Sequence, residues 1–122
     1  MKIENIKFKA KRLDNGEWII GSFVVMKIPA LSKTTIGIVA EGGATLHEVD
    51  PSTVCQFTGL KDKNGTPIYE GDIVKYKDNN AEKIGDINWD SKAVAFCFGC
   101  DFLVNYFSEY MVVIGNKFDK EK

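Results

Sequence analysis

The chain has 122 residues, of which 44% are hydrophobic and 11% aromatic, and this composition excludes a disordered protein. Its 16 basic and 17 acidic residues give a net charge of -1, which argues against a strongly electrostatic nucleic-acid binder and against an acidic tail protein. No apolar run approaches the roughly 18 residues that a membrane-spanning helix needs.

The first predicted strand alternates apolar and basic residues, so one face is expected inward and the other in water. The apolar positions are Ile6, Phe8 and Ala10, and the basic ones are Lys7, Lys9 and Lys11. Asn15-Gly16 then predicts a hairpin turn, because both residues tolerate positive φ. The return strand is expected over 18–26, with a bulge or bend at Gly21.

The rest of the chain also reads as strands separated by turn residues. Turns are expected at 42–43, 50–52, 61–65, 70–72, 78–80 and 90–91, and strands at 34–40, 44–49, 54–58, 73–76, 83–89, 93–104 and 111–115. Helical signals are confined to a turn or two within 101–110. Many short strands at regular spacing favour a barrel or a sandwich.

The stretch QFTGLKDKNGTPIYEGDIVKY at 56–76 resembles the YopX family of small phage and prophage proteins. Two shorter pieces, GDINW at 85–89 and VIGN at 113–116, are similar to family segments at the same spacing. The first half of the chain matches more loosely. The resemblance implies a mostly β fold and a phage or prophage origin, and it brings no agreed activity and no catalytic residue.

The fold prediction is mainly β with little helix. The GDIVKY and GDINW segments suit an SH3-like small β-barrel in residues 54–116. Residues 1–53 are expected to form an N-terminal β-hairpin layer, and residues 117–122 a frayed polar tail. Leu60, Ile68 and Tyr69 are predicted core residues.

Cys97-Phe98-Gly99-Cys100 has the spacing of zinc sites and of thiol redox motifs. Cys55 and His47 are the further ligands that a zinc site would need. The motif lies inside an apolar run that reads as a strand, where residues three apart point to opposite faces unless Gly99 forms a bulge. We therefore expect buried thiols, no metal and no cofactor.

The other acid–base candidates favour structural roles. His47 lies between Leu46 and Glu48 without a recognisable nucleophile motif. Glu70 and Asp72 flank Gly71, and Asp72 is expected to accept backbone N–H bonds in that turn. No phosphate-binding glycine motif is present in the sequence. We therefore expect no enzymatic activity.

Two surfaces are candidates for binding. Loops on rigid sheets carry recognition, which favours a protein-binding or self-associating module that uses the turn after Asp62 and the loop after Tyr76, with Lys61, Asp62, Lys63, Tyr76 and Lys77 as candidate residues. The alternative is weak single-stranded nucleic-acid binding by a basic N-terminal strand that carries Lys7, Lys9, Lys11 and Arg12. No aromatic residue is expected on that basic face.

The N-terminal residues carry charges throughout and lack the apolar stretch of a signal peptide. The three cysteines are an odd number without a disulfide-rich pattern. Both features predict a cytoplasmic protein without a membrane partner, and the resemblance to the YopX family implies that the cell is a bacterial host.

Overall fold

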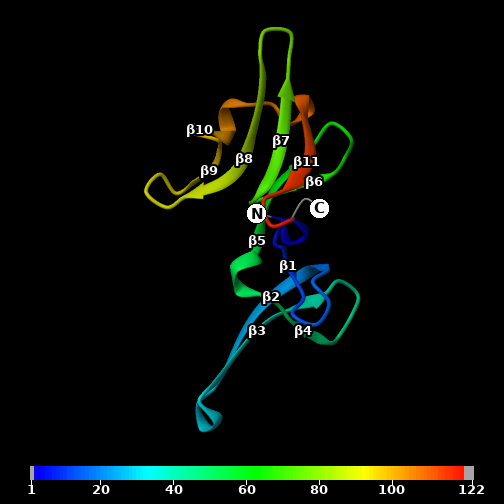
Figure 1. Cartoon of the computed structure of the whole chain (residues 1–122), viewed down its shortest axis with the longest axis vertical. Coiled ribbons are helices and arrows are strands. Elements are labelled where there is room, and N and C mark those ends of the chain that lie inside the picture. The colour runs from blue at the N-terminus through cyan, green and yellow to red at the C-terminus, as the bar shows by residue number, and fades with distance from the viewer. Residues whose placement is uncertain (1, 120–122) are drawn as a thin grey trace. The chain divides into compact units, whose positions relative to one another are not determined.

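Strands make up most of the chain in the computed structural model, which describes residues 2–119 (Figure 1). Within this range the strands are β1 (Phe8–Lys11), β2 (Trp18–Ile28), β3 (Lys33–Ala40), β4 (Leu46–Glu48), β5 (Cys55–Lys61), β6 (Pro67–Tyr69), β7 (Asp72–Lys77), β8 (Glu82–Asp90), β9 (Ala95–Phe98), β10 (Asp101–Phe102) and β11 (Met111–Asn116). The helical elements are the 3-10 turns η1 (Ile3–Asn5), η2 (Pro29–Leu31), η3 (Pro51–Thr53), η4 (Leu103–Asn105) and η5 (Ser108–Tyr110). The prediction of a mainly β chain with little helix is confirmed.

Two compact units divide the chain, Met1–Gln56 and Phe57–Lys122. The strands pair antiparallel throughout the described residues. Strand β5 crosses the boundary, since Cys55 and Gln56 pair with β1 while Phe57 and Lys61 pair with β6.

The first unit is built on neighbouring strands in the order β4-β3-β2-β1, and β1 also pairs with the start of β5. The predicted turn between β1 and β2 is confirmed, with Gly16 at a φ of +71° and its N–H donating to the Arg12 carbonyl. The buried core consists of Ala10, Ile19, Ile38 and Val49, against which Phe8 and Phe23 pack. Ile6 departs from the predicted inward face, because it lies before β1 and is exposed.

Gly21 is neither a bulge nor a bend, contrary to the sequence prediction. It stands in regular register between Phe8 of β1 and Ala40 of β3. A Cβ at this position would overlap the Val39 carbonyl oxygen and lie 2.9 Å from the Val39 carbonyl carbon. The sequence therefore has glycine here because two backbones approach closely.

The second unit carries a five-stranded sheet in the order β10-β9-β8-β7-β11, together with the β5–β6 pair. Its core contains Ile68, Val74, Tyr76, Ile87, Phe98, Leu103 and Met111. The predicted core positions Ile68 and Tyr69 are buried, and Leu60 packs partly buried against the same core. The strands of the described residues do not close into a barrel.

The turn between β6 and β7 matches its prediction. Gly71 has a φ of +87°, and the buried Asp72 accepts a hydrogen bond from the Tyr69 N–H at 2.7 Å. The other carboxylate oxygen of Asp72 accepts from the Asn116 side chain at 3.0 Å. This carboxylate therefore joins the turn to the end of β11.

The apolar run 93–104 is not one strand, as the sequence analysis predicted. Strand β9 ends at Phe98, Gly99 and Cys100 form a two-residue turn, and β10 returns to pair Asp101 with Phe98. Gly99 has a φ of +62°, which suits the first central position of a tight hairpin turn. Residues 103–105 and 108–110 are 3-10 turns, in agreement with the short helical signal predicted there.

Residues 117–119 make hydrogen bonds within the second unit, and the frayed polar tail stays a prediction. The Lys117 N–H donates to the Gly71 carbonyl, and the Phe118 N–H donates to the Asn116 side-chain oxygen. The remainder of the predicted tail, 120–122, lies outside the described residues.

Candidate functional site

Two of the predicted interaction residues are buried. Asp62 is only 6% exposed, and its carboxylate accepts the backbone N–H groups of Asn64, Thr66 and Val113, each at 2.9 Å. Tyr76 is 5% exposed and donates its hydroxyl hydrogen to Asp78. This hydrogen bond raises the pKa of Tyr76 to about 12. Both side chains hold turns together, so they do not belong to an interaction surface.

The predicted residues Lys63 and Lys77 do come together. With Lys75, Glu109, Tyr110 and Val112 they line a surface concavity of about 420 Å³ in the second unit, which we call the lysine concavity. Lys61 is exposed but is not part of its lining. The sequence analysis missed Lys75 and Tyr110, although alternation with the buried Val74 and Tyr76 could have placed Lys75 beside Lys77 on the outer face of β7.

The basic N-terminal strand differs from its prediction in one respect. Trp18 lies among its lysines, with the Lys9 Nζ 4.7 Å and the Lys11 Nζ 5.3 Å from the indole ring centroid. An aromatic residue is therefore present on the basic face, because the β1–β2 register sets Lys11 opposite Trp18. Arg12 is engaged locally, since its guanidinium binds both carboxylate oxygens of Asp14 at 2.9 and 2.6 Å. This hydrogen bond lowers the pKa of Asp14. Lys7 lies just before β1 and is half-buried.

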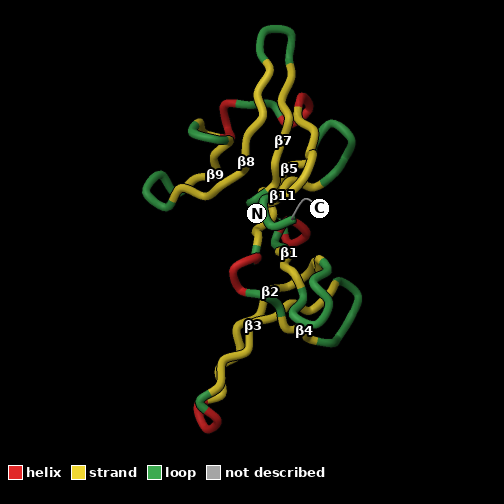
Figure 2. The backbone as a smooth tube through the Cα atoms, in the orientation of Figure 1, coloured by secondary structure: helices red, strands yellow, loops and turns green. Residues whose placement is uncertain are grey.

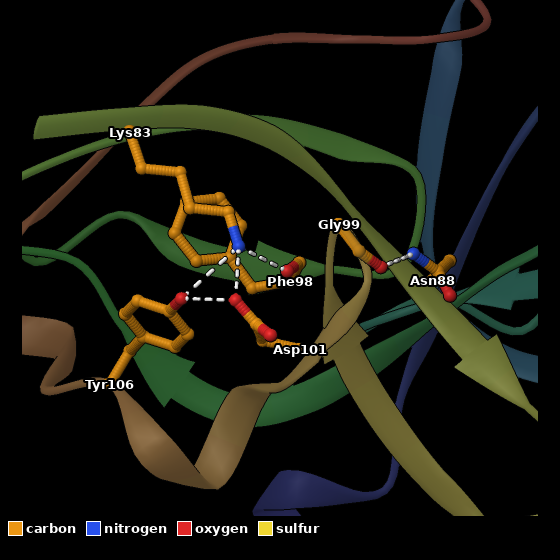
Figure 3. A network of polar contacts seen from close by, with 6 residues as sticks. All are labelled: Lys83, Asn88, Phe98, Gly99, Asp101 and Tyr106. Atoms are coloured by element: carbon orange, nitrogen blue, oxygen red, sulfur yellow. Dashed lines mark hydrogen bonds and ion pairs between the residues drawn. The ribbon is translucent and has the colours of Figure 1, made fainter.

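Lys83, Asp101 and Tyr106 form a polar network of side chains in the second unit (Figure 3). The Lys83 ammonium donates to the Phe98 carbonyl at 2.8 Å, to Asp101 at 2.9 Å and to the Tyr106 hydroxyl at 3.1 Å. It also lies 4.5 Å from the centroid of the Phe98 ring. The three N–H groups of the ammonium are thus all used.

Burial opposes the charge on Lys83, but hydrogen bonds to Asp101 and Tyr106 outweigh it and raise the pKa of Lys83. Two hydrogen bonds lower the pKa of Asp101. The larger effect comes from the Tyr106 hydroxyl and the smaller one from the Lys83 ammonium. Lys83 is therefore a protonated, fully bonded group that joins β8 to the turn after β9. A nucleophilic or proton-abstracting lysine would need the opposite shift.

The C-x-x-C motif spans the end of β9 and the β9–β10 turn. Cys97 is buried in β9 and Cys100 is exposed at the turn. Burial raises the pKa of the Cys97 thiol, whereas reactive thiols have a lowered one. The Cys55 thiol donates to the Thr53 carbonyl in the first unit. Residues 2–119 hold no group of three or more His, Cys, Asp or Glu side chains positioned for a metal ion.

His47 lies on β4, where it lines a small hollow of about 240 Å³ with Leu13, Asp14, Leu46 and Glu48. Glu70 is partly buried in the turn before β7, while Asp72 is committed to structural hydrogen bonds. The expected structural roles agree with these positions.

The β2–β3 hairpin continues well beyond its neighbouring strands. Strand β1 pairs with β2 only as far as Gly21, and β4 pairs with β3 only from Gly37 to Val39. The outer edge of β2 is therefore unpaired over Ser22–Ile28, and Val25–Ile28 of β2 forms a two-stranded ribbon with its partner Lys33–Ile36 of β3, with η2 at the tip (Figure 2). Val25, Met26 and Leu31 are 48%, 45% and 67% exposed on it. We call this segment the β-ribbon.

An apolar hollow of about 380 Å³ opens on the second unit, where it is lined by Thr58, Leu60, Ala95, Phe96, Phe102, Leu103, Val104 and Tyr106. Val104 is 87% exposed at its rim. The sequence analysis missed this hollow because it assigned residues 93–104 to one strand.

No helix within residues 2–119 is long and apolar enough to cross a membrane. Among curated proteins and solved structures, none shows significant similarity to the chain. The family model described as YopX protein matches residues 7–121, which include both the 56–76 string and the loosely matching first half. The chain therefore belongs to the YopX family.

Proposed function

We propose that this YopX-family chain is a non-enzymatic accessory protein of a phage or prophage that acts in the bacterial cytoplasm by self-association. The β-ribbon carries the proposal. Its partner is a second copy of the same chain, which pairs edge to edge through Ser22–Ile28 of β2.

An unpaired strand edge exposes a row of backbone N–H and C=O groups that can pair with another strand. Proteins that remain monomeric protect such edges with charges, prolines or bulges. The Ser22–Ile28 edge has a single charged residue, Lys27, and its register with β3 is regular. Its protection against pairing is therefore limited to this one lysine.

Antiparallel pairing of two identical strands is self-complementary, as a two-fold dimer requires. A register centred on Val25 sets Val25 opposite Val25 and Lys27 opposite Phe23 of the second copy. The two lysines then lie about 13 Å apart along the strands, from a rise of about 3.3 Å per residue, so they do not repel at short range. The ribbon segments hold no acidic residue.

Sedimentation equilibrium of the full chain over a wide concentration range tests this proposal. We expect weak dimerisation, since a short strand pair buries less area than a standard interface. Val25→Lys should weaken it by about tenfold or more, because it sets two like charges directly opposite each other. Thr35→Lys adds the same charge to β3 and should leave it unchanged. A strict monomer, or equal effects of both variants, would refute the proposal.

The absence of enzymatic activity is supported by the Lys83 network, in which the ammonium is protonated and fully hydrogen-bonded. The thiol with a raised pKa at Cys97 supports it as well. The SH3-like barrel in the C-terminal half stays a prediction, and an experimental structure of the full chain would test it.

The second candidate function is weak single-stranded nucleic-acid binding by the N-terminal strand. Trp18 beside Lys9 and Lys11 favours it, because single-strand binders combine basic and aromatic side chains. The Arg12–Asp14 pair weakens it, since that guanidinium is already neutralised. Loss of oligonucleotide binding in a variant with Lys7, Lys9 and Lys11 changed to alanine would support this candidate.

A further inference from the structure

The lysine concavity concentrates positive charge on a chain whose net charge is -1. Its lining carries three lysines and one acid, Glu109. Lys63 and Lys77 make no ion pair with the described residues, and Lys75 approaches Glu82 at 3.7 Å with both side chains about half exposed. Such an exposed pair holds its lysine weakly, so an external anion can compete for it.

Three elements hold these groups in place. Lys75 and Lys77 project from the outer face of β7, two residues apart. The backbone N–H of Lys63 donates to the Met111 carbonyl at 2.9 Å, which ties the 62–66 turn to the start of β11. Asp62 fixes the same turn by accepting the Asn64, Thr66 and Val113 N–H groups. The charge cluster is therefore built on hydrogen-bonded backbone.

An aromatic surface adjoins the lysines. Tyr110 lines the concavity and is 43% exposed, and its ring packs edge-on against the buried Tyr76 at 6.1 Å. Phe107, which is 65% exposed, lies 6.3 Å from Tyr110 between ring centroids. A ring that is held from behind and open in front is a platform on which a base can stack.

We infer that the lysine concavity binds single-stranded nucleic acid, with Lys63, Lys75 and Lys77 on the phosphate backbone and Tyr110 stacked on a base. The adjacent aromatic rings favour this ligand over an acidic peptide, because an acidic peptide would bind the lysines without stacking on the rings. A duplex keeps its bases stacked inside, so it cannot use Tyr110 in this way. The site is separate in sequence from the basic N-terminal strand and from the β-ribbon.

Fluorescence anisotropy with a labelled oligo(dT) of about 20 nucleotides tests the inference on the full chain. Three phosphate contacts to a single strand give a slope of about -2 in log K against log salt, so a fourfold rise in salt should weaken binding roughly 20-fold. Changing Lys63, Lys75 and Lys77 together to alanine should lower the affinity at least tenfold at low salt.

Changing the exposed Lys33, Lys92 and Lys117 to alanine is the matched control, because it removes the same charge outside the concavity and outside the N-terminal strand. It should alter the affinity less than about threefold. Tyr110→Ala should weaken binding about fivefold or more through lost stacking, while Tyr110→Phe keeps the ring and the affinity. Circular dichroism and melting curves would establish that each variant is folded.

Four results would overturn the inference. The first is no binding of oligo(dT) at low salt, and the second is an equal loss of affinity in the two triple variants. The third is an unchanged affinity in Tyr110→Ala. The fourth is that oligo-glutamate or duplex DNA displaces the labelled oligo(dT) as well as unlabelled oligo(dT) does at the same concentration of charge. Self-association is measured separately with Val25→Lys, so a failure of either proposal can be recognised.

Discussion

Asp62 shows how a single buried carboxylate can organise a turn in this chain. It accepts three backbone N–H groups, two from its own turn and one from Val113, which is 51 positions along the chain. We expect Asp62→Ala to destabilise the protein by about 1–3 kcal/mol, because it leaves donors without their acceptor. Denaturant unfolding would measure this change. The exposed neighbour substitution Lys61→Ala should stay within about 0.5 kcal/mol, and equal effects would contradict the structural role of Asp62.

A substitution at Gly21 tests a different constraint on a single residue, which is the close approach of the β2 and β3 backbones. Gly21→Ala should destabilise the protein by about 1–3 kcal/mol or more, because the new Cβ overlaps the Val39 carbonyl of a paired strand. Gly115→Ala in β11 is the matched control, since no atom lies within 4 Å of the added Cβ. Thermal unfolding that ranks the two variants alike would show that the β2–β3 packing is looser than described.

The Lys83 network should make stability depend on pH at both ends of the scale. Because the folded pKa of Lys83 is raised, its contribution is present below the ordinary lysine pKa of about 10.4 and is lost as pH rises through the raised value. Because the folded pKa of Asp101 is lowered, its contribution is present above about pH 4 and is lost as pH falls through the lowered value.

Lys83→Met keeps the aliphatic packing and removes the charge. Its melting temperature should fall below that of the wild type between about pH 5 and pH 10, and the two curves should converge outside this window. Lys92→Met changes an exposed lysine that makes no ion pair with residues 2–119, and it serves as the control. A deficit in Lys83→Met that is constant across pH would mean that packing alone is lost.

At the scale of elements, the β9–β10 hairpin determines which thiol of the C-x-x-C motif is exposed. The turn at Gly99 and Cys100 separates a buried thiol from an exposed one. We expect one fast-reacting thiol per native chain with an aromatic disulfide reagent, and Cys100→Ser should abolish that fast phase. Cys97 should react slowly, because burial raises its thiol pKa. A fast phase that survives in Cys100→Ser would contradict this assignment.

The elements also show what the sequence could predict. Turns with chemical signals, such as Asn15-Gly16 and Glu70-Gly71-Asp72, stand where expected because positive φ and carboxylate acceptors are local requirements. The prediction of a single strand over 93–104 was wrong, because the only local mark of the turn is Gly99, and glycine also occurs inside strands. The functions of Gly21 and Asp62 depend on Val39 and Val113, which are distant partners that a local pattern does not reveal.

For the whole molecule, composition described the sum of the charges but not their placement. A net charge of -1 argued against strong electrostatic binding, yet three lysines gather in one concavity of the second unit. The lysines of that site come from the 61–65 turn and from β7, and they meet only through strand pairing. The β-ribbon was likewise not predicted from the sequence, because its exposure depends on where β1 and β4 stop pairing with β2 and β3.

Self-association through the β-ribbon is the central claim, and site-directed cross-linking at Val25 tests it most directly. Val25→Cys in a Cys100→Ser background should give covalent dimers with a short bifunctional thiol reagent, because opposite residues of an antiparallel pair have Cβ atoms about 4.5–5.5 Å apart. Thr34→Cys, on β3 of the same ribbon, should remain largely monomeric. Failure of Val25→Cys to cross-link at concentrations that support dimers, or equal cross-linking at Thr34, would contradict the account.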